Sequence, residues 1–106
     1  MKPVRRDFLI ELPKPELHCH LDGSLRLETM LDLAQKDKIE LPAKDVDGLR
    51  KAVVVQKRVK NLEEYIEKFQ FTLAVLQTPE ALQRAAFELA EDAAAENVRH
   101  LEVRYS

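Results

Sequence analysis

Apolar residues recur at helical spacing in three segments of the chain, and each spacing predicts an amphipathic helix. The first helix is predicted to begin at Leu27, after an Asp-Gly-Ser turn. The second is predicted as one helix of about four turns, with Asn61 as its N-cap and Glu64 as its capping-box partner. The third has Thr78 as its cap and a proline at its first position, and it ends near Asn97. The apolar stripes of the three helices are Leu27, Met30, Leu31 and Ala34; Leu62, Tyr65, Ile66, Phe69, Leu73 and Leu76; and Leu82, Ala85, Ala86, Leu89, Ala90 and Ala93.

Two shorter segments, residues 16–21 and 99–106, are typical of strands. Pro13 and Pro15 exclude a helix just before the first, because proline lacks an N–H and favours extended predecessors. The order of strand, helices and strand predicts a parallel crossover. Because two parallel strands alone make a poor sheet, the pattern indicates part of a larger α/β fold. Residues 39–60 are predicted to hold short helices and loop.

Composition narrows the class of protein but does not change the predicted helices and strands. The 106 residues are 45% hydrophobic and 34% charged, with a formal charge of −2, which is typical of a globular protein. No basic block indicates a nucleic-acid partner, because the cluster at residues 56–60 is interpreted as a solvated surface. No window approaches the roughly 18 apolar residues of a membrane helix, so no membrane partner is expected. The single cysteine fits a reduced, cytoplasmic setting.

The stretch ELHCHLDGSLR, residues 16–26, carries the candidate chemistry. In a strand, alternate side chains share a face, so His18 and His20 point one way and Cys19 the other. Two imidazoles placed like this can meet one metal ion, although catalytic zinc takes three protein ligands and a water. Asp22 follows at a strand-to-loop junction, where it could bind a substrate or the second nitrogen of a ligand. A chance pair of surface or core histidines is the alternative interpretation.

Two segments of the chain resemble the adenosine deaminase family. PKPELHCHLDGSLRLETMLDLA (residues 13–34) resembles the family's N-terminal signature, and VRHLEVRYS (residues 98–106) resembles its second barrel strand. The helix predicted after Asn61 also resembles the family's intervening segment, whereas Leu27 stands where the family often has proline. The resemblance implies an α/β fold, the N-terminal portion of a (β/α)8 TIM barrel, mostly helical here with two parallel strands. Residues 1–106 would form the N-terminal segment of one barrel domain, with the rest of the barrel absent.

The same resemblance implies roles for particular residues. His18 and His20 would bind Zn2+, and His20 and Asp22 would contact the substrate, with Asp22 at its ribose hydroxyl. Tyr65, Ile66 and Phe69 align with an apolar lid over the pocket, although plain core packing is the alternative. No catalytic acid or base is expected in this chain. His100 is expected to be structural, and Glu102 and Arg104 are expected to pair inside the barrel.

The activity implied for the complete enzyme is hydrolytic deamination of adenosine or 2′-deoxyadenosine to inosine plus ammonia, in purine salvage. The partners would be a small purine nucleoside and the remaining part of the barrel, and the 106-residue chain alone would be inactive. The alternatives are adenine or another nucleoside such as aminodeoxyfutalosine as substrate, or a different amidohydrolase of the superfamily. A non-catalytic α/β protein with structural histidines is the alternative from outside the enzyme class.

Overall fold

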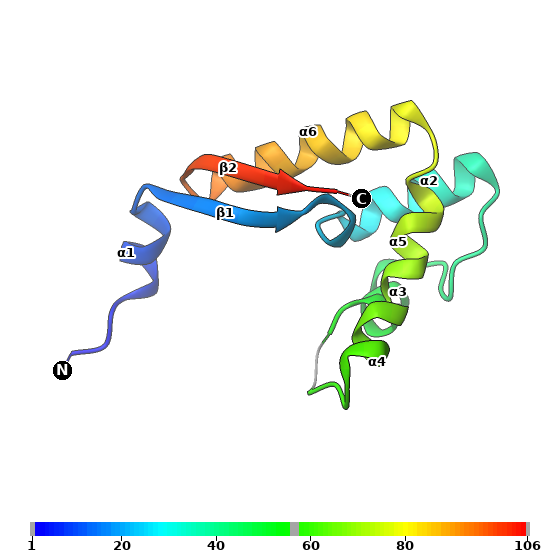
Figure 1. Cartoon of the computed structure of the whole chain (residues 1–106), viewed down its shortest axis with the longest axis horizontal. Helices are drawn as coiled ribbons and strands as arrows, with labels where there is room; N and C mark the ends of the chain where they lie inside the picture. Colours follow the sequence, from blue (N-terminus) through cyan, green and yellow to red (C-terminus); the bar gives the residue numbers. More distant parts are fainter. Residues whose placement is uncertain (1, 56–57, 106) are drawn as a thin grey trace.

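The computed structural model of the chain describes residues 2–55 and 58–105. Its elements lie in the order shown in Figure 1. They are α1 (Arg6–Glu11), β1 (Lys14–His20), the 3-10 turn η1 (Leu21–Gly23), α2 (Leu27–Asp37), α3 (Val46–Val53), α4 (Leu62–Glu67), α5 (Phe69–Val75), α6 (Pro79–Ala95) and β2 (Val98–Arg104). The fold is therefore mostly helical, with two strands, as the sequence and the resemblance predicted.

The described strands form one parallel pair, which confirms the predicted crossover. Lys14 lies opposite Val98 at one end of the pair, and His20 lies opposite Arg104 at the other. β1 begins at Lys14, earlier than expected, and includes Pro15 next to a register irregularity, where an edge strand tolerates proline. α6 runs alongside the pair and packs against β2, so it covers one face of the sheet (Figure 1).

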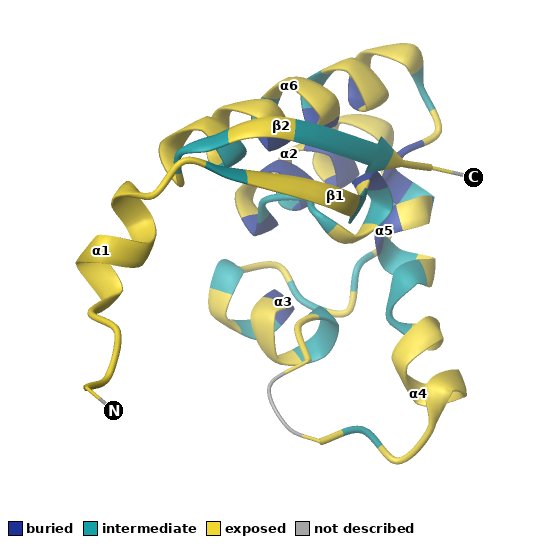
Figure 2. Ribbon diagram, turned by 60° about the vertical axis from the view of Figure 1, so that its left-hand side comes forward, coloured by how far each residue is buried: buried dark blue, intermediate teal, exposed yellow. Residues whose placement is uncertain are grey.

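The core lies between this sheet face, α2, α3, α5 and α6, where the dark blue residues of Figure 2 gather. Its buried members are Leu21, Leu27, Met30, Leu33, Ala34, Leu49, Val75, Leu76, Ala81, Ala85 and Leu89. The predicted stripe of α2 is largely confirmed. On α6, however, the buried line runs through Ala81, Ala85 and Leu89, while Leu82 is 43% exposed. Two of these three buried side chains are alanines, so the face of α6 that packs on the core consists mostly of small residues.

The prediction of one continuous helix over residues 62–76 is wrong. The segment forms two helices, α4 and α5, that meet at Lys68. None of the described residues of α4 is buried, whereas α5 buries Thr72 and Val75. The Lys68 ammonium donates to the Ala52 carbonyl oxygen of α3 at 3.0 Å, which binds the junction to a helix outside this segment.

The expected caps of the later helices are present. The Thr78 hydroxyl accepts a hydrogen bond from the Ala81 amide at the start of α6, and the Asn61 side chain accepts one from the Glu64 amide at the start of α4. The Glu64 carboxylate accepts from the amide of Lys60 at 2.8 Å and not from that of Asn61, so the capping box is displaced by one residue.

Helix α1 was not predicted from the sequence. Its described residues are all exposed, and in Figure 2 it extends away from the rest of the fold. Its carboxyl end is tied to the turn between α6 and β2, because the Asn97 side-chain amide donates to the Glu11 carbonyl. Asn97 itself has a left-handed φ of 59°, a conformation that asparagine tolerates. Among the described residues, no helix combines the length and apolar character needed to cross a bilayer.

Candidate metal and substrate site

The two histidines of β1 lie together on the open side of the sheet. Their Nε2 atoms are 3.1 Å apart, and the ring centroids are 4.9 Å apart in an edge-to-face arrangement. Cys19, between them, is partly buried against the core, and its Sγ lies 3.3 Å from the Ser24 hydroxyl oxygen. The alternation predicted for His18, Cys19 and His20 is therefore what the strand shows.

The spacing of the His18 and His20 Nε2 atoms fits a shared metal ion. Two imidazole nitrogens that bind one tetrahedral zinc at about 2.0–2.1 Å lie roughly 3.3 Å apart, close to the observed 3.1 Å. Without an ion, the same separation allows a hydrogen bond in which one neutral ring donates and the other accepts. Within residues 2–55 and 58–105, no group of three or more His, Cys, Asp or Glu side chains could hold a metal. The pair thus has the spacing of two zinc ligands and no third ligand beside it among the described residues.

Asp22 lies directly beyond His20, in η1. Its Oδ1 atom is 3.7 Å from His20 Nδ1, so the carboxylate faces the ring nitrogen opposite the one that meets His18. Oδ1 is buried and has no hydrogen-bond partner among the residues that the structure describes. Leaving a buried polar atom unpaired costs free energy, about 1–3 kcal/mol in typical cases. A ligand hydroxyl or amide that reached this oxygen would remove that cost.

A cavity of about 260 Å³ opens beside Asp22 and Gly23. One wall is formed by η1 and the start of α2, and the other by the end of α3 together with α4 and α5. Tyr65 and Phe69 line this second wall and touch each other edge to face, with their centroids 5.4 Å apart. The site is therefore mostly apolar with a carboxylate at its edge, a common composition for small-molecule pockets.

The three residues expected to form a lid do not behave alike. Tyr65 is 41% exposed and Ile66 is 54% exposed, so plain core packing does not describe either side chain. Phe69 is half-buried, and its ring edge would lie 3.1 Å from a Cβ placed on Gly23. Ile66 is absent from the described residues that line the cavity. The structure thus brings Tyr65 and Phe69 to Asp22 but leaves Ile66 outside.

Comparison with known proteins assigns this chain to a family. The family model described as adenosine deaminase matches residues 13–106. The chain belongs to the adenosine deaminase family. It is 53% identical to the adenosine deaminase of Vibrio atlanticus over 100 residues, covering 94% of this chain, and 48% identical to that of Clostridium perfringens over 98 residues, covering 92%. The chain spans 30% of the length of each of these relatives.

A solved structure supports the same assignment. The chain resembles the crystal structure of adenine deaminase from Arthrobacter aurescens with a TM-score of 0.74 and 34% identity, over 86% of this chain and 27% of that one. The predicted fold class, a portion of the TIM barrel of the adenosine deaminase family, is thereby confirmed.

Other polar residues of this adenosine deaminase family member lie away from the cavity. His100, on β2, is opposite Pro15 and far along the sheet from His20. Its Nε2 lies 3.7 Å from Glu102 Oε2, and both side chains are well exposed. Among the described ion pairs, Glu102 contacts His100 and not Arg104, so the expected pairing of Glu102 with Arg104 is not seen.

The residues that line the cavity and that sequence reasoning did not single out include Gly23, Lys68 and Thr72. Lys68 and Thr72 follow Tyr65 and Phe69 by three positions each, so they share a helical face with residues that were singled out. This spacing alone indicates that Lys68 and Thr72 lie beside the predicted lid residues. Gly23 was interpreted only as a turn residue, whereas in the fold its missing side chain leaves room for the Phe69 ring.

Proposed function

We propose that this family member acts in the zinc-dependent hydrolytic deamination of adenosine and 2′-deoxyadenosine, which gives the inosine product and ammonia, in the purine salvage of the cytoplasm. The observation that carries the proposal is the 3.1 Å separation of the His18 and His20 Nε2 atoms beside the Asp22 carboxylate. Membership of the adenosine deaminase family and 53% identity to a protein of that name support it.

In this proposal, His18 and His20 hold the metal through their Nε2 atoms. Bound zinc supplies Lewis-acid chemistry that makes water a nucleophile near neutral pH. Asp22, close to His20 Nδ1, favours the ring orientation in which Nε2 is directed at the metal, which is the usual part of a carboxylate beside a histidine ligand.

Asp22 lines the cavity, and a turn of its carboxylate would present the otherwise closed Oδ1 atom to a ribose hydroxyl of the substrate. This assignment gives a partner to an oxygen that has none among the described residues. Tyr65 and Phe69 form the apolar wall against which the nucleoside lies and exclude water from it. α4, whose described residues are all exposed, carries Tyr65 and serves as the lid, with Lys68 as the junction to α5.

The reaction also needs a general acid for the purine ring nitrogen and further metal ligands. None of the described residues is assigned to these roles. Because two imidazoles make an incomplete zinc shell, we expect the 106-residue chain by itself to bind zinc weakly and to catalyse nothing. Deaminase activity of that purified chain after zinc loading would contradict this part of the proposal.

Adenine is the second candidate substrate, because the solved structure that the chain resembles is an adenine deaminase. Adenine has no ribose, so it leaves Asp22 Oδ1 without the partner proposed above. The position of Asp22 at the cavity edge therefore favours a nucleoside.

The test uses the complete gene product and measures both bound zinc and activity toward adenosine, 2′-deoxyadenosine and adenine. We expect about one zinc per chain and a preference for the nucleosides. His18→Ala and His20→Ala should lose both zinc and activity. His100→Ala is the matched control, because His100 is an exposed strand histidine that contacts Glu102, and it should keep both.

Several results would reject the proposal. A zinc-free, inactive wild type would favour the structural interpretation of the histidines. Zinc content that survives His18→Ala and His20→Ala would remove these residues from the metal site. A preference for adenine over adenosine would replace the nucleoside assignment with the second candidate.

A further inference from the structure

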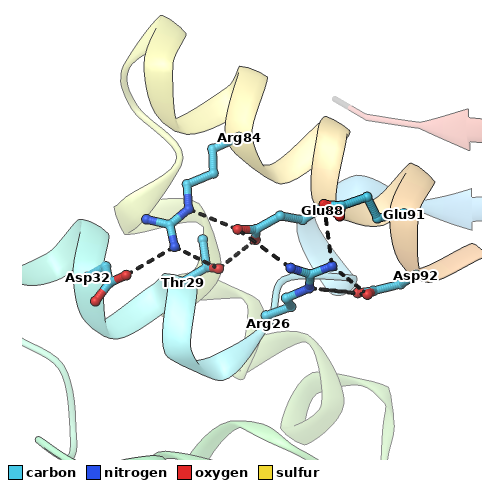
Figure 3. Close-up of polar contacts among 7 residues, drawn as sticks. All are labelled: Arg26, Thr29, Asp32, Arg84, Glu88, Glu91 and Asp92. Carbon is cyan, nitrogen blue, oxygen red and sulfur yellow. Dashed lines mark hydrogen bonds and ion pairs between the residues drawn. The ribbon is translucent and has the colours of Figure 1, made fainter. Parts of the chain in front are cut away.

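An ion-pair network joins α2 to α6 (Figure 3), and none of its residues lines the cavity described above. It consists of Arg26, Thr29, Asp32, Arg84, Glu88 and Asp92, with Glu91 at its rim. Two arginines organise it. Arg84 binds Glu88 at 2.9 Å and Asp32 at 3.0 Å, while Arg26 binds Asp92. Both arginines cross between the same two helices, but only Arg26 belongs to the loop that carries the candidate site.

Arg26 contacts the Asp92 carboxylate through several close hydrogen bonds. Its Nη2 lies 2.7 Å from Asp92 Oδ1, and its Nε lies 3.1 and 3.2 Å from the two carboxylate oxygens. Glu88 and Glu91 approach the same guanidinium at 3.9 and 3.8 Å. Such multiple contacts fix the direction of a guanidinium far better than a single surface pair does.

Arg26 also lies in the loop that follows Asp22, so its contact with α6 can hold that loop in place. It is the N-cap residue of α2 and follows Asp22 by four positions, at the far end of the loop that begins in η1. At the near end of that loop, the Ser24 hydroxyl donates to the His20 carbonyl at 2.6 Å. The loop is thus hydrogen-bonded to β1 through Ser24 and to α6 through Arg26.

Asp22, between His20 and Ser24 in the segment that the Ser24 contact closes, carries an unfavourable group. Asp22 Oδ1 is buried without a partner among the described residues, so the carboxylate would gain free energy by turning toward water. Leu21 is buried in the core and Ser24 is bound to β1, so the chain is held on both sides of Asp22. Arg26 adds a contact that fixes the chain just after Ser24 to α6. Strained groups persist at functional sites when the surrounding contacts over-determine them.

We propose that Arg26, held by Asp92, is a positioning residue for Asp22. It anchors the loop to α6 and thereby keeps the Asp22 carboxylate beside the cavity that Asp22 lines, where it would bind the hydroxyl of a nucleoside. Arg26 does not touch the substrate. The inference rests on the proposed function for the identity of the ligand, while the anchoring of the loop is a separate statement that can be tested without activity.

The variants are Arg26→Gln, Arg26→Lys and Arg84→Gln in the complete gene product. Arg84→Gln is the matched control, because it removes an arginine from the same network and the same pair of helices without touching the loop. If Arg26 acted only as a structural ion pair, Arg26→Gln and Arg84→Gln would have similar consequences. Arg26→Lys keeps the charge and should recover part of the function.

Two readouts are compared. The first is hydrogen exchange of the Ser24 amide, which donates to the Leu21 carbonyl at 3.1 Å across η1. We expect Arg26→Gln to speed this exchange about tenfold relative to Arg84→Gln, because the loop opens locally. The second is the KM for adenosine, which should rise roughly tenfold in Arg26→Gln with little change in kcat, because substrate binding is lost and not the chemistry.

The outcomes separate the two proposals. Equal Ser24 exchange in Arg26→Gln and Arg84→Gln overturns the positioning role, whatever the activity. Faster exchange in Arg26→Gln alone, together with a higher KM for adenosine, supports it. If the wild type does not deaminate nucleosides, the proposed function fails, yet the Ser24 exchange still decides whether Arg26 anchors the Asp22 loop.

Discussion

Thr29 on α2 donates a hydrogen bond to the Glu88 carboxylate on α6, and both side chains are largely withdrawn from water. Burial by itself raises the pKa of Glu88. The hydrogen bonds from Thr29 and Arg84 and the charges of Arg84 and Arg26 outweigh this effect, so the pKa of Glu88 lies below its ordinary value of 4.5. The α2–α6 interface is therefore stabilised by an ionised glutamate.

This pKa predicts acid sensitivity. Because the folded-state pKa of Glu88 is depressed, ionised Glu88 stabilises the fold above the unfolded-state value, and this contribution is lost as the pH falls through the folded-state pKa. We expect Glu88→Gln to lower the free energy of unfolding at about pH 7, and this deficit relative to wild type should shrink on acidification. Urea unfolding across the acid range measures it. Glu91→Gln, at a more exposed carboxylate, should change little, and a Glu88→Gln deficit independent of pH would contradict the prediction.

A second prediction concerns the contact of Gly23 with Phe69. Gly23 has no positive φ, so alanine is allowed by the backbone, but its Cβ would lie 3.1 Å from Phe69 Cε1 and 3.5 Å from Cζ. We expect Gly23→Ala to destabilise by about 1 kcal/mol as the ring is displaced. Phe69→Leu removes the ring edge and should relieve most of that cost. The double-mutant cycle in thermal unfolding measures the coupling, and an equal cost in both backgrounds would argue against the contact.

A third prediction concerns the core. Met30 is 1% exposed and is among the largest fully buried side chains that the structure describes. Met30→Ala should lower the free energy of unfolding by about 2–5 kcal/mol, since it leaves a cavity beneath α2. Leu62→Ala serves as the control, because Leu62 is 68% exposed on α4 and its loss should cost no more than about 0.5 kcal/mol. Comparable losses from the two substitutions would place the core elsewhere.

A fourth prediction compares two helix caps of the same kind. Thr78 caps α6, which buries Ala81, Ala85 and Leu89, so Thr78→Ala should lower global stability by about 1 kcal/mol. Asn61 caps α4, whose described residues are all exposed. Asn61→Ala should therefore fray α4 and speed its amide exchange without a matching loss of global stability. A global loss as large as that of Thr78→Ala would show that α4 is part of the cooperative core.

Local rules predicted much of the fold and of the site. The opposite directions of His18 and Cys19 follow from the period of a strand, and the Thr78 cap follows from side-chain chemistry close in sequence. Features that depend on distant residues were not predictable in the same way. The junction at Lys68 is bound to Ala52 on another helix, and the burial of Ala81 in place of Leu82 is decided by which face of α6 packs on the core.

In the candidate site, too, some features follow from the local sequence and others depend on distant residues. The histidine pair was visible as a strand pattern, but the unpartnered oxygen of Asp22 is a property of packing and has no signature in the sequence. The contact of Arg26 with Asp92 joins residues 66 positions apart, and nothing in either local segment indicates it. Sequence therefore indicated which chemical groups are present, while tertiary contacts decide how Asp22 is held.

The parallel pairing of Lys14 with Val98 has a consequence for how the chain folds. The strands that meet are separated by nearly all of the helices, so pairing them closes most of the chain into one loop, at a cost in conformational entropy. Local helices such as the well-capped α6 can form early, whereas the sheet must wait for this long-range contact. His18 and His20 would then acquire their common orientation late in folding, when β1 joins β2.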